Sequence, residues 1–192
     1  MPEMEEASGI EENSGTETNA KDVIKPEELN SIPDWEEVAK VYGGFLYTVA
    51  FRLSGNDYDA ADLVQETLLR VRKGLVNYQS GSMKAWLSKI ATNAYFDELR
   101  RRKRRPVAFF PDNPDKVIEP SPGAEEVLFA HRIPKDIQAA LMKLPQEFRT
   151  AVILCDIAQL SYSEISQILA IPVGTVRSRI YRGRAMLRKA LA

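Results

Sequence analysis

The chain has 192 residues, of which 44% are hydrophobic and 28% charged, and its formal net charge is −1. This length allows one medium-sized domain or two small ones. No apolar run reaches the roughly 18 residues that a membrane-spanning helix needs. The acidic N-terminus lacks the apolar segment of a secretory signal. A soluble, cytoplasmic protein is therefore expected.

The chain contains one cysteine, Cys155, and one histidine, His131. A single cysteine excludes an internal disulfide framework, and Cys155 ends an apolar run in which a buried structural thiol is expected. His131 has no cysteine or second histidine nearby, so a zinc site is not expected. The sequence predicts no metal and no cofactor.

The net charge hides an uneven distribution. Residues 1–37 hold twelve acids and two bases, a net charge of −10, which leaves +9 for the rest of the chain. Because the first 34 residues are also polar and poor in aromatics, they cannot bury enough apolar area to offset the entropy of ordering, and we predict a disordered acidic tail over 1–34. A basic body attracts polyanions, and an acidic tail can shield it.

Helical patterns begin at Trp35. Apolar residues recur with helical spacing from there to about Gly55, and Asn56 or Asp57 can cap a second helix that ends near Gly74. The second helix has a predicted core stripe, formed by Leu63, Leu68, Val71 and Leu75.

Another face of this second helix combines acids and an amide with one apolar side chain. Its residues are Asp59, Asp62, Gln65, Glu66 and Leu69. Acids in a first turn are ordinary partners of the helix dipole. Leu69 beside them is also what a contact for a partner helix would look like. From the residues alone, both interpretations stay open.

A third helix is predicted from Met83 until Pro106 stops it. Six of the seven residues from Leu99 to Arg105 are basic. One face combines an amide, an aromatic ring and cations, in Lys89, Asn93, Phe96, Asp97 and Arg100. Such sets hold single-stranded nucleic acid by stacking and backbone charge, although a solvated helix end also favours basic residues.

Five of the eleven prolines fall within residues 106–124, which predicts a flexible linker over 106–126. Three or four helices are expected after it. One spans about 125–143, another opens at Pro145, a favourable first helical residue, and a third begins at Ser161. No strand pattern or internal repeat is evident. The expected fold is all-α, with two small helical domains on a Pro-rich tether.

The last two helices form a more specific pattern. Ser161 and Glu164 fit a capping box, and Ala170–Pro172 break the short helix that follows. The next segment, IPVGTVRSRIYRGRAMLR, has five arginines and no acid. Its predicted apolar stripe consists of Val173, Val176, Ile180 and Leu187. Its outward ridge consists of Gly174, Ser178, Tyr181 and Ala185. Arg177 and Arg182 flank that ridge, while Arg179 and Arg184 lie nearer the stripe.

Two helices joined by a tight turn, with a basic second helix, are typical of a helix-turn-helix that reads the DNA major groove. Arginine can pair with guanine through two parallel hydrogen bonds. A merely solvated basic face is the alternative. Gly183 destabilises a helix interior and has no evident function; close packing is the simplest interpretation.

Three stretches together resemble the extracytoplasmic-function group of bacterial sigma factors, in the sigma-70 family. DLVQETLLRVRK resembles the polymerase-binding part of sigma region 2, and WLSKIATNAYFDELRRRKR resembles the adjoining part that reads and opens the −10 element. LPQEFRTAVILCDIAQLSYSEISQILAIPVGTVRSRIYRGRAMLRKAL resembles region 4. The likeness covers about 37–104 and 128–192, and a short linker replaces the large region found between them in housekeeping sigma factors. We therefore expect region 2 over 35–105 and region 4 over 127–192.

The resemblance implies roles for individual residues. Contacts to the clamp coiled coil of the polymerase β′ subunit are implied for Asp62, Leu63, Gln65, Glu66 and Leu69. Contacts to −10 DNA are implied for Lys84, Lys89, Asn93, Arg100 and Arg101, and a pocket for a flipped base around Gln79, Ser80 and Ser82. Contacts to −35 DNA are implied for Arg177, Ser178, Tyr181 and Arg182, with Tyr162 and Thr175 on phosphates.

The implied function is that of an alternative sigma factor, not an enzyme. It would bind core RNA polymerase, including the β flap, and promoter DNA, in a stress response under an anti-sigma factor. A stand-alone helix-turn-helix regulator and a metal-dependent nucleic-acid enzyme using Asp59, Asp62 and Glu66 are the alternatives. Two features depart from the family: the loop NYQSGSMKAW, which leaves the preferred base open, and the acidic tail, which we expect to weaken DNA binding by the free protein.

Overall fold

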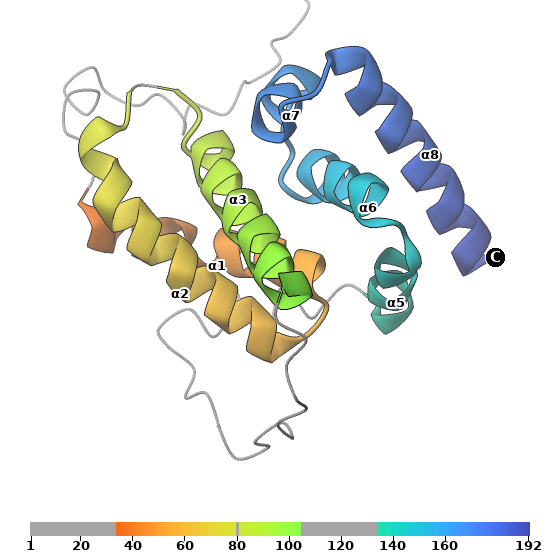
Figure 1. Ribbon diagram of the computed structural model, residues 1–192, viewed down its shortest axis with the longest axis horizontal. Coiled ribbons are helices and arrows are strands. Elements are labelled where there is room, and N and C mark those ends of the chain that lie inside the picture. Colours follow the sequence, from red (N-terminus) through yellow and green to blue (C-terminus); the bar gives the residue numbers. More distant parts are fainter. Residues whose placement is uncertain (1–33, 80, 105–133) are drawn as a thin grey trace, which may run out of the picture. The chain divides into compact units, whose positions relative to one another are not determined.

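The computed structural model describes residues 34–79, 81–104 and 134–192, and all regular secondary structure in those ranges is helical (Figure 1). This agrees with the predicted all-α class. The acidic tail before Asp34, the linker 106–126, and His131 lie outside the described residues.

The first domain consists of three α-helices and one short 3-10 helix. These are α1 (Trp35–Ser54), α2 (Asp57–Gly74), η2 (Leu75–Asn77) and α3 (Met83–Arg104). Figure 1 shows α2 and α3 lying alongside each other, and both contact α1. The three helices thus form one compact bundle.

Local signals fix the junctions between these helices. Gly55 ends α1 in the left-handed region, with φ of 90°, and its N–H donates to the Phe51 carbonyl at 2.8 Å. Asn56 then caps α2, because its side-chain oxygen accepts the Asp59 N–H at 2.8 Å. The adjacent residues Gly55 and Asn56 therefore end α1 and begin α2. At the start of α3, the Ser82 hydroxyl oxygen accepts the Ala85 N–H at 3.2 Å.

The predicted apolar stripes meet in the interior of this domain. A cluster of almost fully buried side chains joins α1, α2, η2 and α3, and it contains Val38, Leu46, Val71, Leu75, Leu87 and Ala91. Burial of such side chains is the main stabilising contribution to a domain of this size. It holds the outward faces of α2 and α3 in a fixed relation.

The second domain is built around the last helix. It consists of α5 (Lys135–Lys143), α6 (Gln146–Val152), the π-helical turn η3 (Ile153–Ile157), α7 (Tyr162–Leu169) and α8 (Val173–Leu191). Helices α5, α6 and α7 all contact α8. Figure 1 shows α8 as the longest helix of this group, with α6 packed across it.

The observed bounds differ from the predicted ones in three places. The described part of the helix predicted over about 125–143 begins at Lys135, and residues 125–133 lie outside the description. Pro145 lies one position before the first helical residue, where its carbonyl accepts the N–H groups of Phe148 and Arg149, both at 3.0 Å. The helix predicted to run on from there instead widens into η3, where the Ala158 N–H donates to the Ile153 carbonyl.

Gly183 explains how closely α6 and α8 approach. A Cβ at this position would lie 2.6 Å from Cγ2 of Val152 and 3.3 Å from the carbonyl oxygen of Phe148. Gly183 itself is buried. The prediction that this glycine serves close packing is confirmed.

Candidate nucleic-acid interface

Hydrogen bonds fix both ends of α7, the short helix that precedes α8. Ser161 and Glu164 form the predicted capping box: the Ser161 N–H donates to Glu164 Oε2 at 2.8 Å, and the Glu164 N–H donates to Ser161 Oγ. The hydrogen bonds from Ser161 lower the pKa of Glu164. Ala170 ends α7 with φ of 51°, and the Ser166 hydroxyl donates to the Ile171 carbonyl at 2.5 Å. The direction in which α8 leaves the turn is therefore set.

The predicted phase of α8 is confirmed except at its first residue, because Val173, which was placed in the apolar stripe, is 41% exposed. Val176 and Ile180 are buried, whereas Ser178 and Tyr181 face outward, and Tyr181 is 72% exposed. The large ring of Tyr181 is therefore accessible on the outward ridge. The outward ridge of α8 is thus available to a partner.

Two of the five arginines in α8 are bound to acids of their own domain. Arg179 lies 3.1 Å from Glu147 of α6, and Arg184 pairs with Asp156 of η3. Arg184 also approaches the sulfur of Cys155, which is half-buried, and burial raises the pKa of that thiol. These arginines hold α8 against α6 and η3.

Arg177 and Arg182 differ from them. Both are exposed, and within the described ranges neither lies within ion-pair distance of an acid. They flank the ridge of Ser178 and Tyr181, as the helical phase predicts. Thr175 is half-buried in the first turn of α8, where its carbonyl accepts the Ser178 hydroxyl at 2.9 Å.

A groove of about 580 Å³ runs along α8 beside this ridge. It brings Tyr162 of α7 together with Arg177 and Tyr181, so three of the six predicted −35 contacts share one surface. Its other lining residues are Asp156, Ile180, Arg184, Leu187, Arg188 and Leu191. The lining thus combines apolar and aromatic side chains with three arginines and one acid.

The predicted −10 surface lies on α3. Lys89 and Asn93 are exposed on this helix one turn apart. Lys84 is also exposed, and its ammonium group lies 5.7 Å from the centre of the Phe45 ring, a cation–π contact. The three side chains lie along the first half of the helix.

Arg100 and Arg101 at the end of α3 have acidic partners on their own helix. Arg100 Nη2 lies 2.5 Å from Asp97 Oδ1, and Arg101 Nε lies 2.7 Å from Glu98 Oε2. Sequence analysis placed Asp97 on this face but did not identify the pairing. The basic end of α3 is therefore partly neutralised by its own acids.

The loop before α3 is braced by an aromatic pair. Tyr78 and Trp86 have ring centres 5.0 Å apart, and the Tyr78 hydroxyl donates to the Gly81 carbonyl at 2.7 Å. Of the predicted pocket residues, Gln79 and Ser82 are exposed, and Ser80 lies outside the described residues. The role of Tyr78 was not predicted from the sequence, although the aromatic residues on either side of this loop, Tyr78 and Trp86, were a usable signal.

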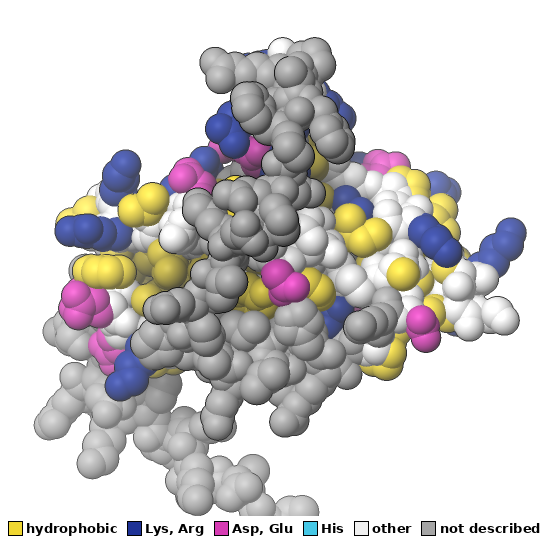
Figure 2. Space-filling model, turned by 90° about the horizontal axis from the view of Figure 1, so that it is seen from below, with side chains coloured by type: hydrophobic (Ala, Val, Ile, Leu, Met, Phe, Trp, Pro, Cys, Tyr) yellow, Lys and Arg dark blue, Asp and Glu magenta, His cyan; other side chains and the backbone are white. Residues whose placement is uncertain are grey.

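The polar face of α2 is exposed. Asp62, Gln65 and Glu66 point into solvent, and Leu69 is 55% exposed beside them. Leu63, the fifth residue of the implied set, is only 7% exposed and packs in the core, and it also lines one pocket together with the other four. Figure 2 shows hydrophobic side chains exposed among basic ones on one face of the molecule.

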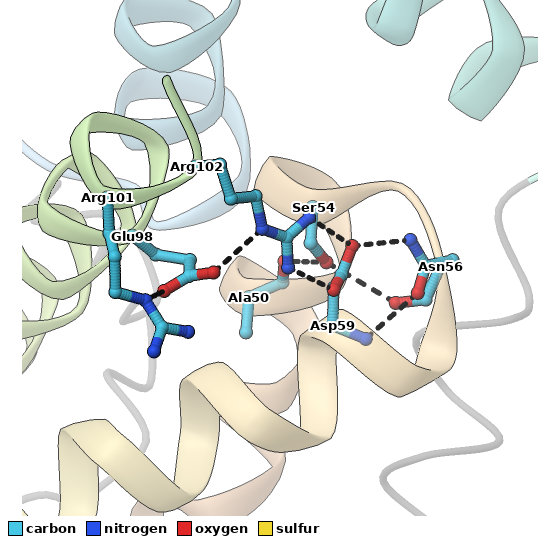
Figure 3. A network of polar contacts seen from close by, with 7 residues as sticks. All are labelled: Ala50, Ser54, Asn56, Asp59, Glu98, Arg101 and Arg102. Atoms are coloured by element: carbon cyan, nitrogen blue, oxygen red, sulfur yellow. Dashed lines mark hydrogen bonds and ion pairs between the residues drawn. The ribbon is translucent and has the colours of Figure 1, made fainter. Parts of the chain in front are cut away.

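A network of ion pairs joins the first turn of α2 to the end of α3 (Figure 3). Arg102 donates two hydrogen bonds to Asp59, at 2.5 and 3.2 Å, and a third to Glu98 at 2.7 Å. The Arg102 guanidinium lowers the pKa of the Asp59 carboxyl, which Asn56 also binds at 2.9 Å. Bidentate pairs of this kind are stronger than single contacts and fix geometry.

Asp59 is therefore engaged in holding α2 and α3 together. Within the described part of the chain, no three His, Cys, Asp or Glu side chains are grouped so that they could hold a metal ion. None of the helices described there is both long and apolar enough to cross a bilayer.

Two family models match the chain in the predicted order. Sigma-70 region 2 matches residues 38–105, and Sigma-70, region 4, matches residues 135–187. The ECF RNA polymerase sigma factor SigE of Mycolicibacterium smegmatis is 46% identical over 162 residues, which are 84% of this chain and 63% of that relative. This chain thus spans less than two thirds of the length of that relative. SigW of Bacillus subtilis is 32% identical over 173 residues, covering 81% of this chain and 87% of SigW.

Solved structures agree in fold. The sigma factor RpoE from Bartonella quintana, in complex with the anti-sigma factor NepR, has a TM-score of 0.64 and 27% identity, covering 82% of this chain and 96% of RpoE. CnrH, in complex with the cytosolic domain of CnrY, has a TM-score of 0.56 and 24% identity, covering 82% of this chain and 86% of CnrH, which shows the fold alone. The chain therefore belongs to the family of extracytoplasmic-function (ECF) RNA polymerase sigma factors.

Proposed function

We propose that this protein binds core RNA polymerase and directs transcription initiation from promoters that carry specific −35 and −10 elements. Sigma factors are transcription regulators rather than enzymes, and we assign catalysis to the polymerase. The protein would act in the cytoplasm, where the polymerase and the promoter DNA are. The matched ranges 38–105 and 135–187 support the proposed domain bounds of 35–105 and 127–192.

The arginine pattern of α8 carries this proposal. Arg179 and Arg184 bind acids within the domain, whereas Arg177 and Arg182 flank an exposed ridge without an acidic partner in the described residues. A helix that presents unpaired guanidinium groups beside a hydroxyl and a tyrosine suits close approach to DNA. Arg177, Ser178, Tyr181 and Arg182 would read bases of the −35 element, with Tyr162 and Thr175 on phosphates.

The first domain would serve the polymerase and the −10 element. Exposed Leu69 beside Asp62, Gln65 and Glu66 supports a protein contact, assigned to the clamp coiled coil of β′, because an apolar side chain among acids suits a basic, amphipathic partner helix. The residues that would contact the opened −10 strand are Lys84, Lys89, Asn93, Arg100 and Arg101. The braced loop with Gln79 and Ser82 would hold an unstacked base.

We also propose control by an anti-sigma factor. A relative with the same fold, RpoE, has been solved with an anti-sigma factor bound. The groove on α8 supports such control here, because Arg177 and Tyr181 line it and belong to the proposed −35 surface as well. An acidic, amphipathic segment that filled this groove would cover residues needed for DNA. The β flap of the polymerase is a further expected contact of this domain, and we expect the inducing signal to be a stress.

The proposal is tested by transcription in vitro from a random promoter library, using purified bacterial core polymerase with and without this protein. Transcripts that start downstream of one shared two-part motif would support it and would supply the motif. If no transcripts depend on the protein, yet the protein alone retards DNA strongly, a stand-alone regulator becomes the better account.

Matched arginine variants sharpen the test. Arg177→Ala and Arg182→Ala should each reduce transcription from the recovered motif by about 5- to 150-fold, since a good base contact contributes about 1–3 kcal/mol. Arg179→Ala removes the same charge from the same helix but only an internal ion pair, so it should have a smaller effect. Equal effects of all three would indicate a charge requirement without base reading.

A further inference from the structure

The arginines at the DNA-facing end of α3 are held by acids rather than free. Asp97 binds Arg100 through its Oδ1 atom at 2.5 Å. The second oxygen of Asp97, Oδ2, accepts a hydrogen bond from Nη1 of Arg70, on α2, at 2.9 Å. One carboxylate therefore bridges arginines from two helices.

Arg70 extends this arrangement toward the polymerase-facing surface. Its Nε donates to Glu66 Oε1 at 2.7 Å, and Glu66 is one of the proposed polymerase contacts. The four side chains form a line of alternating charge, Glu66–Arg70–Asp97–Arg100, which we name the α2–α3 charge chain. One end is a proposed polymerase contact, and the other is a proposed DNA contact.

The links of this chain are exposed enough to exchange partners. Between 36% and 65% of each of the four side chains is accessible to solvent. Exposed ion pairs are individually weak, so a stronger partner at either end can replace one of them. The helices themselves are held by the buried core and need not move.

We propose that Arg70 and Asp97 are positioning residues that couple polymerase binding at Glu66 to DNA binding at Arg100; this rests on the proposed function above. When a basic group of the polymerase binds Glu66, Arg70 loses one acceptor and interacts more strongly with Asp97. Asp97 then holds Arg100 less, and Arg100 becomes available to a phosphate. By linkage, DNA bound at Arg100 favours polymerase binding at Glu66 by the same factor.

The Arg102 network provides an internal control. It also joins α2 to α3 by ion pairs, through Asp59 and Glu98 (Figure 3), but its α2 end is Asp59, which Asn56 holds at the helix cap. Arg102→Gln therefore removes an α2–α3 link without breaking the line from Glu66 to Arg100. If ion pairs between α2 and α3 had only a structural role, Arg102→Gln would have the same effect as a substitution in the charge chain.

The experiment is a binding cycle with the full chain. The affinity of the fluorescently labelled protein for core polymerase is measured with and without a saturating single-stranded oligonucleotide that carries the −10 motif recovered from the promoter library. The ratio of the two affinities is the coupling factor. Arg70→Gln and Asp97→Asn should each lower this factor about two- to fivefold relative to wild type, the range expected for exposed ion pairs. Arg102→Gln should leave it unchanged.

Two further results are expected. The double variant R70Q/D97N should have the same coupling factor as either single variant, because one broken link interrupts the chain. Asp97→Asn should also increase the affinity of the free protein for the oligonucleotide, because Arg100 is released. Circular dichroism checks that every variant is folded.

Four outcomes would overturn the inference. The coupling factor of the wild-type protein could equal one, or it could be unchanged in Arg70→Gln and Asp97→Asn. Arg102→Gln could lower the coupling factor as much as those variants do, or Asp97→Asn could bind the oligonucleotide more weakly than wild type. A wild-type protein that neither binds core polymerase nor starts transcription would refute the proposed function itself. Normal transcription with unchanged coupling factors would refute the charge chain alone.

Discussion

A single methyl group added at Gly183 should destabilise the second domain. In Gly183→Ala, the new Cβ would lie 2.6 Å from Val152 Cγ2, closer than side chains tolerate, and 3.3 Å from the Phe148 carbonyl oxygen. Val152 is buried and β-branched, so it has little freedom to rotate away. The carbonyl oxygen belongs to the backbone of α6. Relief therefore requires α6 and α8 to move apart.

The magnitude follows from two opposing effects. Alanine stabilises a helix interior by about 1 kcal/mol relative to glycine, and overpacking a well-packed core costs about 1–3 kcal/mol. Because the clash involves a stiff side chain and a backbone atom, we place the cost near the upper end. Gly183→Ala should then lower the free energy of unfolding of this domain by about 1–2 kcal/mol.

Gly174 provides the matched control in the same helix. A Cβ there has no atom within 4 Å, so Gly174→Ala should leave stability unchanged or raise it by up to about 1 kcal/mol. Hydrogen–deuterium exchange of peptides from α6 and α8 reports the local opening energy. Where the exchange rate follows the local opening equilibrium, the protection factors of α6 and α8 amides in Gly183→Ala should fall about 5- to 30-fold relative to wild type.

Two results would refute this reasoning. One is a Gly183→Ala protein as well protected as wild type, which would mean that the close approach of α6 and α8 is not needed. The other concerns the pairing with Val152. Val152→Ala should cost less in the Gly183→Ala background than in wild type, because it removes the clashing methyl group. Additive effects would show that the predicted contact is not the cause.

Three further predictions concern other parts of the chain. Leu69→Ala should weaken core polymerase binding by about 1–2 kcal/mol, measured by fluorescence titration. Val76→Ala should leave that affinity unchanged, although the Val76 side chain on η2 is even more exposed. Arg102 lowers the pKa of Asp59 in the folded protein. This ion pair therefore stabilises the fold fully at pH values above the pKa of an aspartate in the unfolded chain, about 3.9. The stabilisation is lost as the pH falls below that value and through the lower pKa of the folded protein. Urea midpoints from tryptophan fluorescence should therefore fall between about pH 5 and 3, less steeply in Asp59→Asn. Deleting residues 1–33 should tighten DNA binding by the free protein at low salt and steepen its salt dependence; an unchanged affinity would contradict shielding by the tail.

Sequence reasoning was most successful where the signal is local. Asn56, Ser161 and Glu164 cap helices as predicted, because a cap is decided by residues within one turn of each other. The phase of α8 was also correct, since Val176 and Ile180 follow a helical repeat. The helical content and the helix-turn-helix follow from such short-range patterns.

The rest depended on contacts between residues far apart in the chain. Arg179 binds Glu147, 32 positions away, and Arg102 binds Asp59, 43 positions away. No local pattern distinguishes these arginines from unpaired ones. The π turn at η3 was missed for a related reason: an apolar run predicts a helix but does not fix which carbonyl accepts each N–H. Leu63 was placed in the core stripe of α2 from its spacing and is buried, whereas its implied contact with the polymerase stays a prediction.

The separation of the α8 arginines into two classes has an evolutionary consequence. The tied arginines belong to the fold, so replacing them removes an ion pair within the domain. Arg177, Ser178, Tyr181 and Arg182 are exposed and can change with little effect on folding. After gene duplication, a few substitutions on this one ridge would therefore change the surface that a copy presents, while the ion pairs that hold its scaffold stayed intact.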